Sequence, residues 1–396
     1  MSRLPIIAMS LDDWRGPWAG RQQLLSRLAR KGWPIVYSNG PLSIWERKTE
    51  KWRQAPLLSG SERSDGLHLD RPGRLTPSWS AAPRWNALCY RLHARHLLRQ
   101  ARLAKGDAGI LFLFNPLLAD YIDHTGLPFV AYHAFDSFSR FPNWSERHAR
   151  LEARLTERAQ LVLATTAGIA QDLTEPGPSK AIVLPNGGDY ESFSRSADLS
   201  VPADLAAIPS PRIGYVGRLS PKVDLALIEE LARRRPSWHW LFIGPVVLGD
   251  RKKNDFNQSL YESLERFKRI GNIHFLGNKP HEELPNYLAG LDVATMPYRT
   301  SGGWWVNGYP LKLHEYLASG GPVVSAGLEA IRPFGDVVDI VETADGWEAA
   351  LARAIENGGV GTPQTRRAVA KANSWDQRAD DLDRMLQELI SGPREA

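Results

Sequence analysis

Short apolar segments of strand length alternate with helical patterns along almost the whole chain. In the first half, the predicted strands are residues 5–11, 34–38, 109–114, 128–132, 159–165 and 180–185. In the second half, they are residues 211–217, 239–244, 272–277, 291–297, 321–326 and 337–341. Between the strands, apolar residues recur at helical spacing, as they do in residues 21–32 and 84–106. Nearly continuous apolar strands that alternate with helices are typical of parallel sheets covered on both faces, so the sequence predicts an α/β fold.

Two such series in tandem predict two Rossmann-like, doubly wound parallel-sheet domains that face a cleft. A chain of 396 residues is long enough for both. We expect a first domain over residues 1–191, a linker over 192–210 and a second domain over 211–373. The last helix, within 374–396, is expected to return to the first domain, and residues 39–83 to form an irregular insertion. Ligands in such folds bind at the carboxyl ends of the strands, so the cleft is the expected site.

The composition excludes several classes of protein. With 43% hydrophobic and 23% charged residues, it is that of an ordinary globular protein. The single cysteine, Cys89, excludes an internal disulfide framework and a cysteine-rich metal site. No run approaches the length of a membrane span, and the first residues lack the apolar core of a signal peptide, so we expect a cytoplasmic protein.

Positive charge is concentrated in residues 45–105. This stretch holds 13 Lys and Arg against 5 Asp and Glu, a net charge of +8, while the whole chain carries +5. Trp45, Trp52, Trp79 and Trp85 lie among these charges. Basic residues mixed with Trp fit contact with an anionic membrane surface or an anionic substrate, and a solvated basic face is the alternative. No nucleic-acid-binding motif accompanies them, so we do not expect a nucleic-acid partner.

The stretch "NGYPLKLHEYLASGG", residues 307–321, predicts a short helix. Pro310 suits the first helical position, and Gly320 suits the end, so we expect the helix over residues 310–319. Its apolar residues fall on one face, which should pack on the sheet: Leu313, Tyr316 and Leu317.

Lys312 and Glu315 fall on another face of this helix. The helix N-terminus and Lys312 would form an anion site, and Glu315 could accept two hydrogen bonds from a vicinal diol such as ribose. The alternative is an ordinary ion pair between the two residues, worth about 0.2–0.5 kcal/mol. The preceding loop, residues 300–309, is rich in Gly and Trp, which favours a backbone that approaches a ligand closely.

A second candidate anion site is the turn "GYVGRLSPKVD", residues 214–224. A predicted strand ends at Gly217, and Arg218 and Lys222 follow before a helix. Such a turn offers amide donors and positive charge, which suit a diphosphate. A solvent-exposed turn with two ordinary basic residues is the alternative.

Two titratable residues follow a strand of the first domain. His133 and Asp136 lie in "VAYHAFDSFSRF", residues 130–141, and Asp136 could act as a general base toward a sugar hydroxyl. A helix-capping or turn Asp is the alternative.

The loop before the first helix, residues 11–23, could shape a pocket for a second substrate. Gly16 and Gly20 flank Trp18, and Arg21 follows. The glycine spacing is not that of a dinucleotide-binding fingerprint.

Taken in order, these motifs resemble those of nucleotide-sugar-dependent glycosyltransferases with two Rossmann-like domains, the GT-B fold. The stretch "VLPNGGDYESF", residues 183–193, resembles the interdomain signature of these enzymes. The turn at residues 214–224, the stretch at 272–298 and "PLKLHEYLASGGPVV" at 310–324 resemble their donor-binding elements. The first half is similar to bacterial polysaccharide-assembly transferases, including the glucuronosyltransferase kind.

The resemblance implies transfer of a sugar from a nucleoside diphosphate-sugar to a glycan or lipid-linked saccharide, without a metal or other cofactor. It implies that the first domain binds the acceptor and the second the nucleotide-sugar. The implied donor site comprises Arg218, Lys222, Gly303, Asn307, Tyr309, Pro310, Leu311, Lys312 and Glu315. The implied acceptor site comprises Gly16, Trp18, Gly20 and Arg21. The implied catalytic residues are Asp136 and His133, and peripheral contact with the inner membrane surface is a further expectation.

Two departures from the family pattern leave the stereochemistry open. Asn307 stands eight positions before Glu315, where retaining enzymes of this type have a second Glu. Ser137 stands where a second Asp is common. Inverting enzymes of this fold use an Asp base in the first domain, and Asp136 is our candidate. A UDP-sugar 2-epimerase and a non-catalytic glycan-binding protein of the same fold are the alternatives.

Overall fold

A computed structural model describes residues 3–16, 18–79, 81–141, 144–173, 181–196, 199–248 and 255–392. The chain divides into two compact units. Unit 1 comprises Met1–Pro185 together with Arg378–Ala396, and unit 2 comprises Asn186–Gln377. Both are α/β units built on a twisted sheet, so the predicted fold class of two doubly wound α/β domains is confirmed.

Unit 1 is built on an eight-stranded sheet with the order β3-β4-β2-β1-β5-β6-β7-β8. Its strands are β1 (Ile6–Met9), β2 (Ile35–Ser38), β3 (Gly60–Ser64), β4 (Leu67–Arg71), β5 (Ile110–Leu113), β6 (Phe129–Ala134), β7 (Leu161–Ala164) and β8 (Ala181–Val183). All neighbours pair in parallel except β3, which is antiparallel to β4. The central strands are buried on both faces, which explains their continuous apolar sequences.

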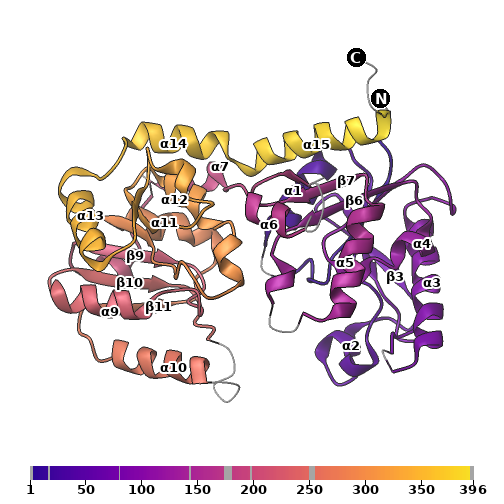
Figure 1. Ribbon diagram of the computed structural model, residues 1–396, viewed down its shortest axis with the longest axis horizontal. Coiled ribbons are helices and arrows are strands. Elements are labelled where there is room, and N and C mark those ends of the chain that lie inside the picture. Colours follow the sequence, from indigo (N-terminus) through magenta and orange to yellow (C-terminus); the bar gives the residue numbers. More distant parts are fainter. Residues whose placement is uncertain are drawn as a thin grey trace. The chain divides into compact units, whose positions relative to one another are not determined.

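The helices of unit 1 connect these strands (Figure 1). They are α1 (Gly20–Arg30), α2 (Glu50–Gln54), α3 (Pro83–Gln100), α4 (Tyr121–Thr125), α5 (Glu146–Arg158), α6 (Ala167–Asp172) and most of α15 (Trp375–Ser391). Helix α15 is anchored to the N-terminal strand region because Asp383 accepts from Trp33 Nε1 at 2.6 Å and pairs with Arg3 at 3.4 Å. The last helix therefore belongs to unit 1 from Arg378 onward.

Unit 2 is built on a six-stranded parallel sheet with the order β11-β10-β9-β12-β13-β14. Its strands are β9 (Arg212–Val216), β10 (His239–Ile243), β11 (Ile273–Gly277), β12 (Val293–Met296), β13 (Val323–Ala326) and β14 (Asp339–Val341). Its helices are α7 (Tyr190–Phe193), α8 (Ala203–Ala206), α9 (Leu225–Arg234), α10 (Asp255–Phe267), α11 (Leu284–Ala289), α12 (Lys312–Ser319), α13 (Ala344–Asn357) and α14 (Pro363–Ala372). Helices α9, α10 and α13 cover one face of the sheet, and α11, α12 and α14 the other (Figure 1).

Two segments differ from what the composition indicated. Residues 39–83 are not irregular throughout, because they contain α2 and the β3–β4 hairpin, and β4 joins the parallel sheet. The hairpin turns at Asp65 and Gly66, both at positive φ, which is the geometry that an Asp-Gly pair favours. Residues 192–210 belong to unit 2, where Leu205 of α8 is fully buried in the core.

Candidate functional site

Helix α12 begins at the carboxyl end of β9 and is fixed there by one tyrosine. The hydroxyl of Tyr316 accepts from Val216 N at 2.7 Å and donates to Val216 O at 3.1 Å. Gly320, at φ 85°, ends the helix in the left-handed conformation that its sequence predicted. The position of the first helical turn relative to the strand end is therefore determined by a buried side chain.

Lys312, the first residue of α12, extends its ammonium group toward the end of β9. Its Nζ lies 3.7 Å from the ring centroid of Tyr215 and 5.7 Å from that of Tyr298. A Cβ at Gly217 would lie 2.7 Å from this Nζ, so a side chain at this position would displace the ammonium group. The predicted turn and the predicted helix thus meet at Gly217 and Lys312.

A second ammonium group lies at the same place. Lys222 Nζ is 5.1 Å from the Tyr298 ring centroid, so both lysines lie near one aromatic ring. Burial, and next the positive charge of Lys222, lower the pKa of Lys312 well below its usual value, while Glu315 opposes the shift. In the described part of the chain, no carboxylate forms an ion pair with Lys312. This arrangement is favourable for a bound anion, because a ligand would supply the missing negative charge.

The backbone around this site is tightly packed at two glycines. Gly217 (φ 129°) and Gly244 (φ 142°) end β9 and β10, and a Cβ at Gly244 would lie 2.3 Å from Gly217 O. Arg218 follows with an exposed side chain, and its carbonyl accepts from the Tyr215 hydroxyl at 3.0 Å. The strand ends are therefore rigid, while the guanidinium of Arg218 is accessible to a ligand.

Glu315 lies one turn into α12, and burial raises its pKa to about 7. His281 and Lys312 oppose this shift, and the negative charge of Asp189 adds to it. His281 Nε2 lies 3.9 Å from Asp189 Oδ2, and this carboxylate, together with Glu315, raises the pKa of His281. The sequence motifs did not identify His281 or Asp189 as site residues, although both lie in stretches that carry the family resemblance.

Asp189 keeps its negative charge despite its burial. Burial acts to raise its pKa, but His281 and Ser192 outweigh it and lower the pKa to about 2. Asp189 also caps α7, because its Oδ1 accepts from Ser192 N at 3.3 Å. Near Glu315 there is therefore one fixed carboxylate and one imidazole, which together tune the protonation of Glu315.

The segment "NGGD", residues 186–189, packs against the start of α12. A Cβ at Gly188 would lie 2.6 Å from His314 Cβ and 3.1 Å from Glu315 N. Asn186 donates from Nδ2 to Tyr309 O at 3.2 Å. Gly188 and Asn186 therefore help to position the start of α12.

Packing inside the loop before α12 explains why one of its residues is a glycine. A Cβ at Gly303 would lie 2.3 Å from ring carbons of Trp305, so Gly303 makes room for that ring. The Trp305 Nε1 donates to Arg299 O at 3.1 Å, which holds the ring in place. Ligand contact by Gly303 stays a prediction.

The other predicted donor residues surround the start of α12. Asn307 ends a 3₁₀ turn over Trp304–Asn307. Tyr309 shares a 2.6 Å hydrogen bond between its hydroxyl and His314 Nε2. Pro310 is buried and Leu311 is exposed at the N-cap position. The structure thus brings the predicted donor residues to one end of the sheet of unit 2.

In unit 1, His133 lies inside the core instead of at the surface. It is 1% exposed at the end of β6, and its ring centroid is 4.2 Å from that of Phe135 and 6.3 Å from that of Phe114. Burial lowers its pKa to about 3, so the ring is neutral. A neutral ring enclosed by aromatic side chains favours a packing role, and a catalytic role of His133 stays a prediction.

Asp136 is half-buried in the loop that follows β6. The next residue, Ser137, donates to Asp172 Oδ2 at 2.6 Å, and Arg140 donates to both oxygens of Asp172 at 2.9 and 3.0 Å. Asp136 follows the carboxyl end of the central strand β6, which is the position expected of a general base. These bonds fix the part of the loop that follows Asp136.

A carboxyl group with an unusual pKa lies near this loop. Burial raises the pKa of Glu152 to about 7, and the hydroxyl of Tyr132 donates to it at 2.9 Å. The charge of Asp172 contributes to the same shift. No sequence pattern identified Glu152, because it lies in an ordinary charged helix.

The predicted acceptor loop is partly ordered by its own contacts. Gly16 N donates to Asp13 O at 3.1 Å and closes a turn, and Gly20 is the buried first residue of α1. Trp18 is exposed, with its ring centroid 6.2 Å from that of Trp14. Of these residues, Trp18 is therefore the one with a large surface open to a ligand.

Arg21 is engaged in an ion pair. Its Nη2 lies 2.7 Å from Asp12 Oδ2, and the carbonyl of Asp12 accepts from the Tyr37 hydroxyl at 2.6 Å. Burial raises the pKa of Tyr37 to about 12, against the opposing charge of Arg21. Arg21 thus stabilises the loop, and acceptor binding by Arg21 stays a prediction.

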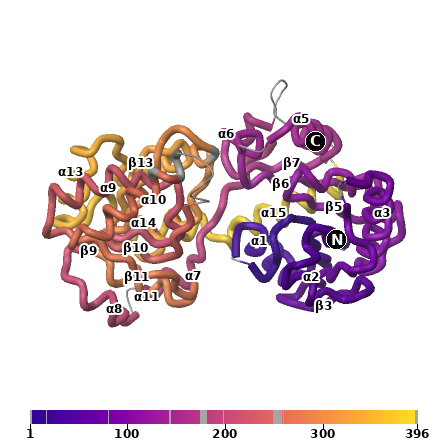
Figure 2. The backbone as a smooth tube through the Cα atoms, turned by 90° about the horizontal axis from the view of Figure 1, so that it is seen from below, coloured from indigo at the N-terminus to yellow at the C-terminus, as the bar shows by residue number. Residues whose placement is uncertain are grey.

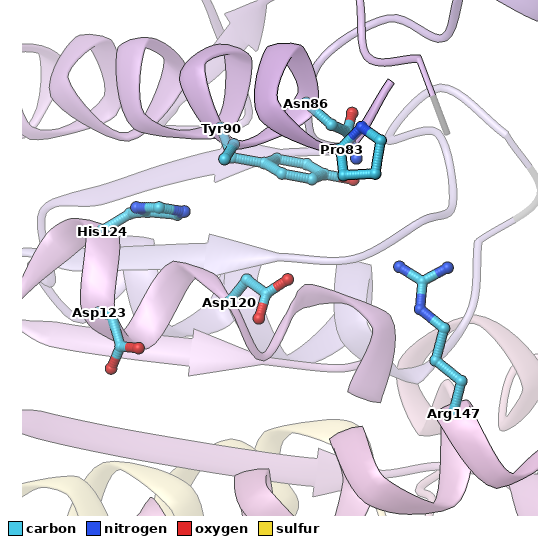
Figure 3. A pocket seen from close by; sticks show the side chains of 8 residues that line it. Pro83, Asn86, Tyr90, Asp120, Asp123, His124 and Arg147 are labelled. Carbon is cyan, nitrogen blue, oxygen red and sulfur yellow. The ribbon is translucent and has the colours of Figure 1, made fainter. Parts of the chain in front are cut away.

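A surface pocket of about 490 Å³ lies elsewhere in unit 1, between α3, α4 and the start of α5. Figure 3 shows Tyr90 and Pro83 on one side of it, Asp120 opposite them, and Arg147 extending toward the space between. An aromatic ring together with carboxylate, amide and guanidinium groups can stack on a sugar and hydrogen-bond its hydroxyls. None of the residues predicted from the sequence lines this pocket.

Within the described ranges, no group of three or more His, Cys, Asp or Glu side chains is placed to hold a metal ion. The basic residues at the predicted donor site in unit 2 are Lys312, Lys222 and Arg218, and transfer without a metal ion stays a prediction.

Comparison with known proteins shows similarity in sequence and in fold. Residues 210–357, which lie within unit 2, match the model of the family glycosyl transferases group 1. The chain has the GT-B fold: it superimposes on sucrose-phosphate synthase from Thermosynechococcus elongatus with a TM-score of 0.71 and 16% identity, over 98% of this chain and 100% of the other. Anabaena HepE in complex with UDP-glucose is similar, with a TM-score of 0.69 and 14% identity over 98% and 100% of the two chains.

A curated relative is similar in sequence. The chain is 27% identical over 234 residues to the putative teichuronic acid biosynthesis glycosyltransferase TuaH of Bacillus subtilis, over 57% of this chain and 56% of the relative. The match thus spans about half the length of that relative.

Proposed function

We propose that the protein transfers a sugar from a nucleoside diphosphate-sugar to a glycan or lipid-linked saccharide acceptor. The observation that carries the proposal is the pair of ammonium groups of Lys312 and Lys222, which lie near the ring of Tyr298 at the carboxyl end of β9. Lys312 has no carboxylate ion-pair partner in the described chain, and an anion at this place would relieve the repulsion between two positive charges.

In the proposed donor complex, each group acts on one part of the nucleotide. Lys312, Lys222, Arg218 and the amides at the start of α12 bind the diphosphate. Glu315 accepts hydrogen bonds from the ribose hydroxyls. As the bond to the sugar breaks, the diphosphate gains negative charge, and these preorganised cations stabilise it.

The acceptor is proposed to bind to unit 1, with Asp136 close to the reacting hydroxyl. Two places are candidates, the exposed ring of Trp18 and the pocket beside Tyr90. The similarity to a transferase named for teichuronic acid biosynthesis supports a role in bacterial polysaccharide or glycoconjugate assembly. If the enzyme inverts, Asp136 takes the proton of the acceptor hydroxyl.

The donor site is tested by titrating nucleoside diphosphates and nucleotide-sugars into the protein by calorimetry. We expect Lys312→Ala and Glu315→Gln each to weaken binding by about tenfold or more, since each removes a charge-assisted hydrogen bond. Lys371→Ala and Glu356→Gln are matched controls, because both change the same residue types at exposed positions of unit 2. Unchanged affinity in both site variants would refute the assignment.

The acceptor position is tested by two variants at exposed side chains. If the pocket binds the acceptor, Arg147→Ala raises the acceptor KM and Trp18→Ala does not. The reverse result assigns the acceptor to the loop before α1. Equal, unchanged KM values in both variants would contradict both positions.

A further inference from the structure

Exposed large hydrophobic side chains are concentrated in one part of unit 1. Of the sixteen described residues of this kind, eight lie between Trp45 and Leu92. Two of them are the most exposed of all, Trp45 at 70% and Leu58 at 73%. We call the part of the surface formed by residues 42–59 and 73–95 the α2–α3 surface. It lies at one edge of unit 1, where α2, β3 and α3 gather in both views (Figures 1 and 2).

The loops of this surface are joined by backbone hydrogen bonds. Ile44 N donates to Ser78 O at 2.9 Å, and Ser78 N donates to Leu42 O at 2.7 Å. In the neighbouring pair of segments, Leu75 N donates to Leu57 O at 3.3 Å. The exposed leucines and tryptophans are therefore presented by defined backbone.

An apolar pocket of about 370 Å³ opens on the same surface. Its lining consists of Ile44, Pro77, Trp79, Ala82 and Trp85. The Nε1 of Trp85 donates to Pro77 O at 2.8 Å, which fixes the indole ring in the pocket wall. This pocket could accept part of an apolar chain.

Helix α3 continues the surface with an outward apolar stripe. Trp85, Leu88 and Leu92 are three and four residues apart, so they lie on one face, and all three are exposed. The opposite side of α3 packs into the core through Ala94, Leu97 and Leu98. An ordinary surface helix has one apolar face, but α3 has two.

Basic residues accompany the apolar ones. Arg84, Arg91, Arg95 and Arg99 lie on the exposed side of α3, and within the described residues none of them forms an ion pair. No Asp or Glu occurs between Asp70 and Asp107. The surface is therefore both apolar and strongly cationic.

We propose that the α2–α3 surface binds the interface of an anionic lipid membrane. Tryptophan prefers the headgroup region, leucine side chains partition into the acyl boundary, and arginines are attracted to anionic headgroups. A second copy of the chain would bring the same arginines face to face, and this repulsion disfavours self-association through the surface. No helix in the described residues is long and apolar enough to cross a membrane. The proposal is independent of the donor site, which lies in unit 2.

The test is co-sedimentation of the full chain with vesicles of phosphatidylcholine alone and of phosphatidylcholine mixed with phosphatidylglycerol. We expect binding to the anionic vesicles and at least tenfold weaker binding to the neutral ones. Arg91→Glu/Arg95→Glu should lower the affinity for anionic vesicles by about tenfold or more, because two attractive charges become repulsive. Trp45→Ser/Leu58→Ser should lower it through loss of apolar insertion.

Two double variants are matched controls on unit 2. Arg269→Glu/Lys371→Glu makes the same change in net charge, and Val246→Ser/Val247→Ser removes two other exposed apolar side chains. All substituted positions are exposed, and circular dichroism checks that each variant is folded. Failure of the wild-type protein to bind anionic vesicles would overturn the proposal. So would equal losses in the surface and control variants, or dimer formation that the surface variants abolish.

Discussion

Lys312 and Glu315 lie three residues apart on one helix, yet no ion pair joins them, and the pKa of each is shifted in the direction that favours its neutral form. Burial and Lys222 lower the pKa of Lys312, while burial raises that of Glu315 to about 7. A simple surface ion pair would have shifted each pKa in the other direction. The two residues therefore fit separate contacts to a ligand, one to phosphate and one to hydroxyl groups.

Replacing Lys312 is expected to stabilise the protein without ligand. In Lys312→Met, the buried ammonium group and its repulsion with Lys222 are removed, while the aliphatic stem is kept. We expect the Tm of the free protein at pH 7 to rise by a few degrees, and the increase in Tm that a nucleotide causes to shrink. Lys371→Met is the control; a lower Tm of the free Lys312 variant would contradict the expectation.

The pH dependence of stability should change in Glu315→Gln. The folded-state pKa of Glu315 is about 7 against 4.5 for the ordinary group, so the folded protein binds a proton more tightly than the unfolded chain. Its contribution to stability is therefore complete below about pH 4.5 and is lost as the pH rises through about 7. Relative to Glu315→Gln, the wild-type Tm should decline between pH 5 and pH 8 in scans without ligand. Parallel curves of Tm against pH for the two proteins would show that the pKa of Glu315 is not raised in the folded protein.

Asp136→Asn should abolish transfer while donor binding is kept. A general base commonly contributes about 10²–10⁴-fold to the rate, and the amide cannot accept the proton. Turnover should fall by at least about 100-fold, with the nucleotide Kd from calorimetry unchanged. Ser139→Ala, in the same loop, is a control. Near-normal turnover of Asp136→Asn would show that Asp136 is not the general base.

His133→Leu should retain turnover. The ring is neutral and enclosed by Phe114 and Phe135, so an apolar side chain of similar volume costs less than about 1.5 kcal/mol in stability. Urea unfolding and initial rates measure the two quantities. A large loss of turnover in a folded variant would return His133 to the catalytic residues.

Arg366 is hydrogen-bonded to the C-terminal end of helix α12, which carries Lys312 and Glu315. It is 1% exposed, and its guanidinium donates to the carbonyls of Gly320 at 3.0 Å, Val360 at 2.7 Å and Gly361 at 3.3 Å. Arg366→Met leaves these carbonyls without a donor and should lower the stability of unit 2 by about 3 kcal/mol or more. Denaturant unfolding measures the loss of stability, and a nucleotide titration measures the effect on the donor site. Arg269 is exposed, so Arg269→Met should change the stability little. Equal losses of stability in the two variants would contradict a structural role of the Arg366 hydrogen bonds.

The central strands were predictable because each is buried on both faces and therefore apolar throughout. The β3–β4 hairpin was missed for a related reason. Strand β3 is an edge strand of polar residues, Gly60–Ser64, and such a strand carries no apolar pattern. The Asp65-Gly66 pair was the available signal, because it favours the turn between the two strands.

The donor-site motifs were predictable for a local reason: the helix, its glycine end and the strand-end turn each depend on a few consecutive residues. The proximity of Lys312 to Lys222, and of Glu315 to His281, depends on strands and helices that are distant in the sequence. Spacing along one helix predicted which face Lys312 and Glu315 share, but not which charges surround them.

The sequence by itself thus determined the two α/β units and the helix that carries Lys312 and Glu315, because periodicity and turn residues act locally. Only the tertiary structure decided which polar residues are accessible and which are enclosed. His133 and Asp136 are three residues apart in one motif, yet the first lies in an aromatic core and the second in a half-buried loop. Burial and electrostatic environment depend on neighbours brought together by folding, and these neighbours set both pKa and access to substrate.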